Sequence, residues 1–222
     1  MNKSENAVII VAAGASTRFG SSTPKQFLKL GSMPVFMWSV RAFQKTQCFS
    51  QIIVVVSSPY LRTLQPLAQN HGFELTCGGD LRSDSVKAGL MQLKAPIKYV
   101  AIHDGARPLI TPDIIIKGLD AARRHSASVI AVPARDTIKL STQKFVVKKT
   151  IPRSSIWLAQ TPQTFKRSVI ERAYTRRRTM VTDDAQAVES SGIAARIVPG
   201  DYRNLKITDR RDLEIARLLM KA

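Results

Sequence analysis

Short strand-like apolar runs alternate along the chain with longer segments in which apolar residues recur at helical spacing. The strand candidates cover residues 7–11, 52–56, 74–77, 99–103 and 128–132. Helical spacing covers residues 34–45, 83–93 and 209–220. Continuous apolar runs are typical of parallel strands buried on both faces, and their alternation with helices is typical of an α/β fold. We therefore predict a doubly wound, mostly parallel, Rossmann-like sheet whose ligands bind at the carboxyl ends of its strands.

Capping residues predict two further helix starts. Thr111 stands directly before Pro112, which predicts a hydroxyl cap followed by proline at the first helical position. Thr182-Asp183-Asp184 predicts another start, and Gly192 is expected to end that helix. These elements continue the α/β order without an internal repeat.

The segment from about residue 134 to residue 157 interrupts this order. Residues 137–140 and 144–147 flank the polar stretch 141–143, as two strands flank the turn of a hairpin. A hairpin alone is marginally stable in water, so packing against a second subunit is one way to stabilise it. The alternative is a surface hairpin that lies on its own domain. We predict a β-arm that projects from a single domain spanning residues 1–222.

Length and composition agree with one enzyme domain. A chain of 222 residues with 44% hydrophobic content can bury a full core. No apolar run approaches the roughly 20 residues of a membrane-spanning helix, and Glu5 together with the brevity of the run 7–13 argues against an export signal. Cys48 and Cys77 lack metal-ligand spacing and are expected to be reduced thiols. We expect a cytoplasmic protein without a membrane partner.

The charge is strongly positive. The chain carries 34 Lys and Arg against 16 Asp and Glu, a net charge of +18, which attracts polyanions in general. The basic residues are scattered; Arg176-Arg177-Arg178 is a short run that we interpret as a solvated helix face. Because no nucleic-acid-binding motif accompanies them, specific nucleic-acid binding is not expected. A positive field also suits a triphosphate or a phosphorylated substrate.

Small residues and two cations follow the first predicted strand. Residues 12–16 read Ala-Ala-Gly-Ala-Ser, Arg18 comes two positions later, and Pro24-Lys25-Gln26 follows. Small residues let a backbone approach a ligand and donate N–H groups, while Arg18 and Lys25 supply positive charge for phosphate oxygens. The loop has neither the Gly-Lys-Ser/Thr nor the Gly-x-Gly-x-x-Gly pattern, which disfavours a kinase or a dehydrogenase. We predict a nucleoside triphosphate site here.

Three further clusters lie at predicted strand ends or before the last helix. Residues 78–80, Gly-Gly-Asp, precede Arg82 and Ser85 and suit a close approach of backbone to a base, with Ser85 helping to start the next helix. Asp104 follows the fourth strand and is a candidate for a divalent metal or a sugar hydroxyl. Arg107 and Lys206 are candidates for phosphates. We interpret His103, at the end of the same strand as Asp104, as a buried structural histidine.

Taken in order, these motifs resemble the 2-C-methyl-D-erythritol 4-phosphate cytidylyltransferase family among the alditol-phosphate cytidylyltransferases. The resemblance extends through Arg135-Asp136-Thr137, Gln160-Thr161-Pro162-Gln163, Thr182-Asp183-Asp184 and Asn204-Leu205-Lys206-Ile207-Thr208. In the family's loop signature, Ala-Ala-Gly-x-Gly-x-Arg, the second glycine is Ser16 here. Ribitol-5-phosphate cytidylyltransferases share most of these motifs and are the second hypothesis. A non-catalytic basic protein that binds nucleotides or nucleic acid is the third.

The resemblance implies a nucleotide-diphospho-sugar transferase-like fold, Mg²⁺ dependence and a homodimer that exchanges β-arms. It implies transfer of the cytidylyl group of CTP to 2-C-methyl-D-erythritol 4-phosphate, which releases pyrophosphate in non-mevalonate isoprenoid synthesis. The implied catalytic residues are Arg18, Lys25, Lys206 and Arg153, the last from the partner's arm. The implied nucleotide-binding residues are Ala12, Ala13, Gly14, Ala15, Gly78, Gly79, Asp80 and Ser85. The implied residues for the polyol phosphate are Asp104, Arg107, Thr137 and Thr182, with Asp104 also a metal candidate.

Overall fold

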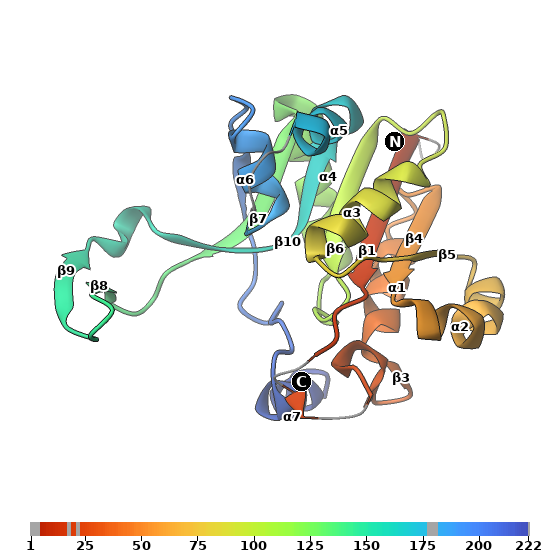
Figure 1. Ribbon diagram of the computed structural model, residues 1–222, viewed down its shortest axis with the longest axis horizontal. Helices are drawn as coiled ribbons and strands as arrows, with labels where there is room; N and C mark the ends of the chain where they lie inside the picture. The colour runs from red at the N-terminus through yellow and green to blue at the C-terminus, as the bar shows by residue number, and fades with distance from the viewer. Residues whose placement is uncertain (1–4, 17–18, 21–22, 177–181, 222) are drawn as a thin grey trace.

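A seven-stranded sheet forms the centre of the computed structural model, which describes residues 5–16, 19–20, 23–176 and 182–221 (Figure 1). In chain order its strands are β1 (Asn6–Ala12), β4 (Gln51–Val56), β5 (Glu74–Cys77), β6 (Tyr99–Asp104), β7 (Ala127–Pro133), β10 (Trp157–Lys166) and β11 (Arg196–Pro199). Their spatial order is β11-β7-β10-β6-β1-β4-β5. Strand β10 runs antiparallel to both neighbours, and the other described pairs within this sheet are parallel. The predicted mostly parallel sheet is confirmed.

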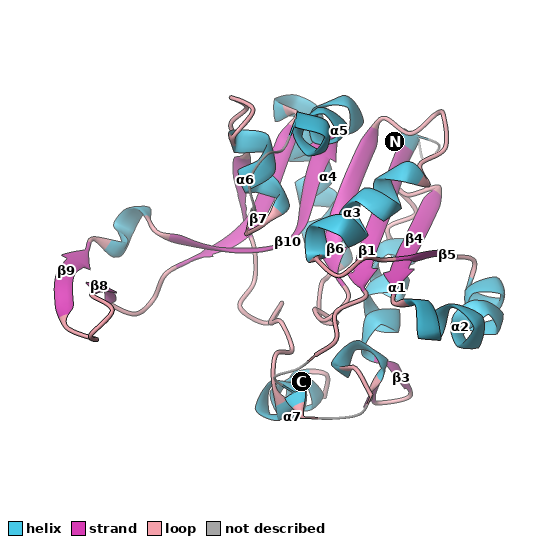
Figure 2. Cartoon of the chain, viewed as in Figure 1, coloured by secondary structure: helices cyan, strands magenta, loops and turns pink. Residues whose placement is uncertain are grey.

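Helices cover both faces of this sheet (Figure 2). They are α1 (Val35–Lys45), α2 (Ser58–His71), α3 (Arg82–Met91), α4 (Pro112–His125), α5 (Arg167–Arg176) and α6 (Asp184–Glu189). The remaining helix, α7 (Arg210–Leu219), lies away from the sheet and packs in a separate small core with Leu30 and Val35. In β1, Val8 and Ile10 pack in one core with α1, α2 and α4, whereas Ala7 and Ile9 pack in another with α3, α5 and α6. Since successive side chains of a strand face opposite sides, helices on both faces bury the consecutive apolar residues of β1.

The five predicted strands and the helices at residues 34–45, 83–93 and 209–220 are confirmed within a few residues. Helix α4 begins with Pro112 as predicted, but the side chain of Thr111 makes no capping hydrogen bond, so the predicted hydroxyl cap is wrong. Asp183 does cap α6, where its carboxylate accepts a hydrogen bond from the Gln186 N–H. Helix α6 ends before Gly192, which has a positive φ of 81°.

A two-stranded hairpin projects from the body between β7 and β10, as predicted (Figure 1). It consists of β8 (Ile138–Ser141) and β9 (Val147–Ile151), followed by the short helix η4 (Arg153–Ser155). Most of its residues are exposed to solvent. The arm therefore gains little burial from its own chain.

The predicted second strand of the hairpin, residues 144–147, is wrong. The turn runs over residues 142–146, where the Phe145 N–H bonds to the Thr142 carbonyl and Phe145 takes φ +60°. The Thr142 hydroxyl also accepts a hydrogen bond from the Val146 N–H, and this longer turn moves the register so that Ser141 pairs with Val147. The apolar residues at positions 145–147 suggested a strand, but Phe145 belongs to the turn, where its side chain is 93% exposed.

Parallel strands bring the carboxyl ends of β1, β4, β5 and β6 to one edge of the sheet. The loops after β5 and β6 are bonded to the ends of neighbouring strands, from Gly78 N–H to the Val56 carbonyl of β4 and from Gly105 N–H to the Val11 carbonyl of β1. The segment before α7 reaches the same edge, where Ile207 N–H bonds to the Ala106 carbonyl. The remaining short elements are η3 (Lys25–Phe27), β2 (Lys29–Leu30) and β3 (Met33–Pro34).

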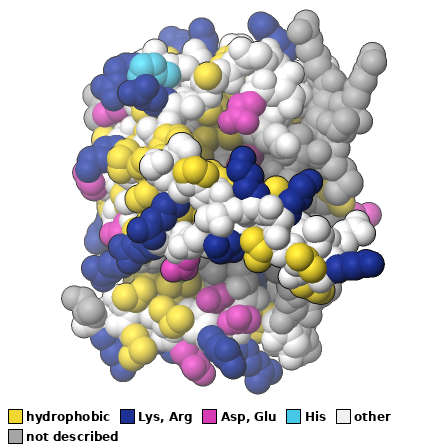
Figure 3. Space-filling model, turned by 90° about the vertical axis from the view of Figure 1, so that its left-hand side faces the viewer, with side chains coloured by type: hydrophobic (Ala, Val, Ile, Leu, Met, Phe, Trp, Pro, Cys, Tyr) yellow, Lys and Arg dark blue, Asp and Glu magenta, His cyan; other side chains and the backbone are white. Residues whose placement is uncertain are grey.

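Lys and Arg side chains are spread over the face shown in Figure 3, interspersed with apolar and neutral groups. This distribution agrees with the scattered basic positions in the sequence. Among the helices that the structure describes, none has the length and apolar character needed to cross a membrane. Cys48 is buried and Cys77 exposed, and the structure shows no disulfide between them, in line with the expected reduced thiols.

Candidate active site

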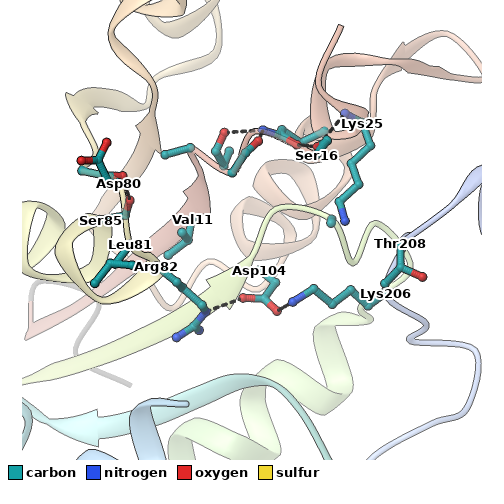
Figure 4. Close-up of a pocket in the computed structure, with 16 residues that line it drawn as sticks. Val11, Ser16, Lys25, Asp80, Leu81, Arg82, Ser85, Asp104, Lys206 and Thr208 are labelled. Atoms are coloured by element: carbon teal, nitrogen blue, oxygen red, sulfur yellow. Dashed lines mark hydrogen bonds and ion pairs between the residues drawn. The ribbon is translucent and has the colours of Figure 1, made fainter. Parts of the chain in front are cut away.

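A pocket of about 260 Å³ opens at the carboxyl edge of the sheet (Figure 4). Three of the predicted clusters meet there: the loop after β1, the start of α3 and the segment before α7. The predicted nucleotide-binding residues in its wall are Ala12, Ala13, Gly14, Gly79, Asp80 and Ser85. Lys25 lines one side and Lys206 another. The structure thus places two cations from distant parts of the chain around one cavity.

The side chain of Gln26 holds the backbone of the loop after β1 in place. This side chain is 3% exposed, and its Nε2 donates hydrogen bonds of 2.8 Å to the carbonyls of Ala12 and Gly14. With these carbonyls held, the loop has a defined shape before any ligand binds. Ala15 follows this held portion but does not line the pocket. Arg18, the other predicted cation, lies outside the described residues.

The glycines after β5 serve close packing. A Cβ at Gly78 would lie 2.5 Å from Ser85 Oγ and 2.7 Å from Ala13 Cβ, so only glycine fits there. Gly78 itself does not line the pocket, whereas Gly79 does. Asp84, rather than Ser85, bonds the exposed start of α3, because its carboxylate accepts a hydrogen bond from the Leu81 N–H. The prediction that Ser85 helps to start the helix is therefore wrong.

Asp104, at the end of β6, binds two cations. Arg82 Nε lies 3.1 Å from one carboxylate oxygen and Lys206 Nζ lies 2.7 Å from the other (Figure 4). Burial alone would raise the pKa of Asp104, but Arg82 and Lys206 outweigh it and hold this pKa well below its usual range. Asp104 is therefore a carboxylate at physiological pH.

Arg82 links Asp104 to a second buried carboxylate. Its NH2 group lies 2.7 Å from Asp184, which is fully buried and accepts a hydrogen bond of 2.6 Å from the Tyr174 hydroxyl. Burial lowers the pKa of Arg82, but Asp184 and Asp104 raise it well above its usual value. These ion pairs and the Tyr174 hydrogen bond connect α3, β6, α5, α6 and the segment before α7.

His103 is buried and bonded through both ring nitrogens, as expected of a structural histidine. Nδ1 lies 3.1 Å from the hydroxyl of Thr161, and Nε2 lies 3.2 Å from both the Ser39 hydroxyl and the Arg107 carbonyl. Thr161 in turn accepts the Asp104 N–H. Burial lowers the pKa of His103 to about 4, so the ring is neutral at physiological pH.

A second pocket, of about 240 Å³, lies on the other side of Asp104. Arg82, Asp104 and Lys206 line both pockets. The second pocket also contains two further residues predicted for the polyol phosphate, Arg107 and Thr182. The residues that sequence reasoning had not assigned to it are Ala159, Gln160, Thr161, Gln163 and Asp183.

Arg107 is held by the segment that carries Lys206. Its guanidinium donates a 2.8 Å hydrogen bond to the Asn204 carbonyl, while its buried Nε has no hydrogen-bond partner among the described residues. Burial lowers the pKa of Arg107, with Asp104 opposing this effect and Arg82 adding to it. The Arg107 side chain lines the second pocket and brings positive charge to it.

Two predicted site residues lie away from both pockets. Thr137 and Arg153 are on the arm, and neither lines the cavities at the carboxyl edge. Arg153 donates a hydrogen bond to the carbonyl of Arg135 at the base of the arm. Within one chain, the structure therefore does not bring these two residues to the rest of the predicted site.

The comparisons with known proteins agree with this arrangement. Residues 6–222 match the family model described as 2-C-methyl-D-erythritol 4-phosphate cytidylyltransferase. The chain belongs to this family. A family member from Endomicrobium trichonymphae is 42% identical over 98% of this chain and its own full length. One from Alkaliphilus oremlandii is 38% identical over 99% of this chain and 97% of its own.

Solved structures of 2-C-methyl-D-erythritol 4-phosphate cytidylyltransferases share the fold. The Thermus thermophilus enzyme superposes with a TM-score of 0.83 at 29% identity and covers 98% of this chain and 100% of its own. A 4-diphosphocytidyl-2C-methyl-D-erythritol synthase from Anaerococcus prevotii gives a TM-score of 0.87 at 25% identity, covering 98% and 99%. Family membership makes this chain a nucleotidyltransferase and favours the methylerythritol hypothesis over the ribitol and non-catalytic ones.

Proposed function

We propose that this chain transfers the cytidylyl group of CTP to 2-C-methyl-D-erythritol 4-phosphate. The acceptor phosphate oxygen forms a bond to the α-phosphorus of CTP, and the bond to the leaving pyrophosphate breaks. The main observation in support of this proposal is that two pockets share a wall of Arg82, Asp104 and Lys206, so that two phosphorylated substrates can meet there. The product is 4-diphosphocytidyl-2-C-methyl-D-erythritol.

CTP occupies the larger pocket in this proposal. The loop at residues 12–15, with Arg18 and Lys25, receives the triphosphate and neutralises charge on the leaving pyrophosphate. Residues 78–80 and Ser85 select the cytosine base. Support comes from the wall of the pocket, which contains Lys25 and most of these small residues.

The polyol phosphate occupies the second pocket. Lys206 orients its attacking phosphate, and the guanidinium of Arg107, which lines the same pocket, adds positive charge beside it. Asp104 accepts hydrogen bonds from the polyol hydroxyls, and the Thr182 hydroxyl can accept or donate them. The attacking phosphate is already ionised, so the reaction needs no general base. The site promotes the reaction by orienting this phosphate and neutralising its charge.

Mg²⁺ is the expected cofactor, and the phosphates of CTP would supply most of its ligands. The described residues contain no group of three or more His, Cys, Asp or Glu side chains placed to hold a metal. Asp104 is the carboxylate best placed to contribute, although both its oxygens bind cations already. When bound, Mg²⁺ neutralises phosphate charge.

A homodimer completes the site in this proposal. The arm exposes apolar side chains that a second copy would bury, among them Phe145 at 93%, Val146 at 61% and Val147 at 56%. Thr137 and Arg153 on the arm then reach the acceptor pocket of the partner subunit. Reduced cysteines at positions 48 and 77, which form no disulfide in the structure, agree with a reducing compartment, and we place the enzyme in the cytoplasm.

Pyrophosphate release tests the function. Purified protein is incubated with CTP and Mg²⁺, and 2-C-methyl-D-erythritol 4-phosphate and D-ribitol 5-phosphate are supplied in parallel. Turnover with the branched polyol, and little with ribitol phosphate, is the expected result. Turnover with ribitol phosphate alone would replace the acceptor, and no turnover with either substrate would overturn the proposal.

A further inference from the structure

The loop after β1 holds a serine at a position that suits glycine. Ser16 has φ +57°, in the left-handed region, which glycine enters freely and residues with a Cβ disfavour. The loop signature quoted above has its second glycine at this position. The chain thus keeps the conformation of glycine with a residue less suited to it, and any benefit has to come from the side chain.

The Ser16 hydroxyl joins two parts of the nucleotide site. It accepts a 3.1 Å hydrogen bond from the backbone N–H of Lys25 and donates one of 3.1 Å to Gln26 Oε1. Gln26 carries the connection onward, because its Nε2 donates to the carbonyls of Ala12 and Gly14. A glycine at position 16 could make neither hydroxyl bond.

We propose that Ser16 is a positioning residue that fixes Lys25 against the loop that receives the triphosphate. The inference rests on the function proposed above, in which Lys25 contacts phosphate. The hydroxyl sets the place of the Lys25 backbone and, through Gln26, holds the loop in the same unit. Loop and cation are thereby preformed, so less reorganisation is needed as charge develops in the reaction.

Direct contact between Ser16 and phosphate is the competing explanation, because Ser16 also lines the pocket. A hydroxyl has one hydrogen to donate, and here that hydrogen goes to Gln26. The two explanations differ in how Ser16 depends on Lys25. A positioning role disappears when the Lys25 side chain is absent, whereas a direct contact does not.

A double-mutant cycle separates them. We would measure kcat and the KM for CTP in the wild type, Ser16→Gly, Lys25→Ala and the double variant. Ser16→Gly should lower kcat/KM about fivefold to tenfold, as expected for one or two lost hydrogen bonds. In the Lys25→Ala background the same change should have less than about a twofold effect. Equal losses in both backgrounds, or no loss in the wild type, would overturn the proposal.

Ser126→Gly is the matched control. Ser126 also has a left-handed φ, +67°, at the end of α4, and it lines neither pocket. The substitution Ser126→Gly should leave turnover unchanged. Ser16→Gly removes the same backbone strain, so a lower melting temperature should not accompany its loss of activity.

Amide hydrogen exchange at Lys25 gives a readout that does not depend on catalysis. The Lys25 N–H should exchange faster in Ser16→Gly than in the wild type, because its hydroxyl acceptor is gone. Unchanged exchange would overturn the positioning role even in an active enzyme. Conversely, a wild-type protein that releases no pyrophosphate would refute the proposed function, while faster exchange would still support the link between Ser16 and Lys25.

Discussion

Asp104 shows how much a single residue depends on partners that are distant in the sequence. Its position after an apolar strand made it a candidate for binding metal or hydroxyl groups. The structure adds Arg82 and Lys206, which occupy both carboxylate oxygens. Ion pairing of this kind depends on side-chain geometry, so the sequence pattern could identify the carboxylate but not the cations that bind it.

Lys25 should be essential for turnover at the residue scale. Lys25→Ala removes a cation from the wall of the nucleotide pocket, and we expect kcat to fall about 100-fold or more, as for loss of a preorganised transition-state donor. Pyrophosphate release measures the effect. Lys29→Ala, at an exposed position four residues later that does not line the pocket, should retain full activity; an equal loss there would point to a general charge effect.

His103 should make stability depend on pH. Its folded pKa of about 4 lies below the value of 6.5 for a free histidine, so below pH 6.5 the unfolded chain takes up a proton that the folded one does not. Stability should fall as pH drops from about 6.5 to 4 and the loss should level off below that range, reaching about 3 kcal/mol from this group. The Asp104 charge and the hydrogen bond to the Arg107 carbonyl oppose the lowering of this pKa by burial, whereas the charge of the Arg107 guanidinium adds to it.

Urea unfolding of the wild type and His103→Gln at pH 7.5, 6.5, 5.5 and 4.5 would measure this effect. The glutamine variant has lower stability at neutral pH but no imidazole to protonate, so its free energy of unfolding should decline less steeply with acid. Parallel pH profiles for the two proteins would show that other groups cause the acid sensitivity.

Elements meet at the site through links that no local pattern reveals. Helix α6 was predicted from its capping residues, and Arg82 belongs to a quoted motif, yet their contact through Asp184 spans 102 positions. Strands β10 and β11 and helix α2 were absent from the prediction, and α5 was anticipated only through the basic run that begins at its last residue, Arg176. In β10, Gln160, Thr161, Gln163 and Thr164 are buried, and such polar residues hide a strand from a hydrophobic pattern.

Asp184→Asn should loosen the contact between α6 and α3. Removing the buried charge leaves Arg82 with one carboxylate where it had two, and we expect a loss of about 3 kcal/mol in the free energy of unfolding. Denaturant unfolding would measure it. Asp113→Asn breaks the exposed pair with Lys117 and should change the unfolding midpoint little; equal midpoint shifts in the two variants would contradict a special role for the buried link.

The molecule consists of a body built around the seven-stranded sheet and an arm that extends away from it (Figure 1). The pockets lie in the body, whereas Thr137 and Arg153 lie on the arm, which buries little against its own chain. A closed dimer would bring each arm to its partner and bury the apolar tip. Molecular mass in solution from light scattering is expected to be twice that of the chain.

Subunit mixing tests whether Arg153 acts across that dimer. Arg153→Ala and Lys25→Ala proteins should each be nearly inactive, but a mixed dimer has one site that carries both intact residues. After unfolding and refolding together in equal amounts, the mixture should recover about a quarter of wild-type activity, because half of the dimers are mixed and each has one intact site. No recovery would place Arg153 in the site of its own subunit.

By itself, the sequence determined the α/β class, the order of the central elements, the projecting arm and the clusters at strand ends, because hydrophobic periodicity and turn chemistry are local properties. The family motifs added the expected chemistry. Tertiary structure alone decided that Arg82, Asp104 and Lys206 form the wall between two pockets and that Ser16 connects the loop to Lys25. It also decided the hairpin register, since these features arise from the packing and hydrogen-bond geometry of side chains and turns that sequence spacing does not encode.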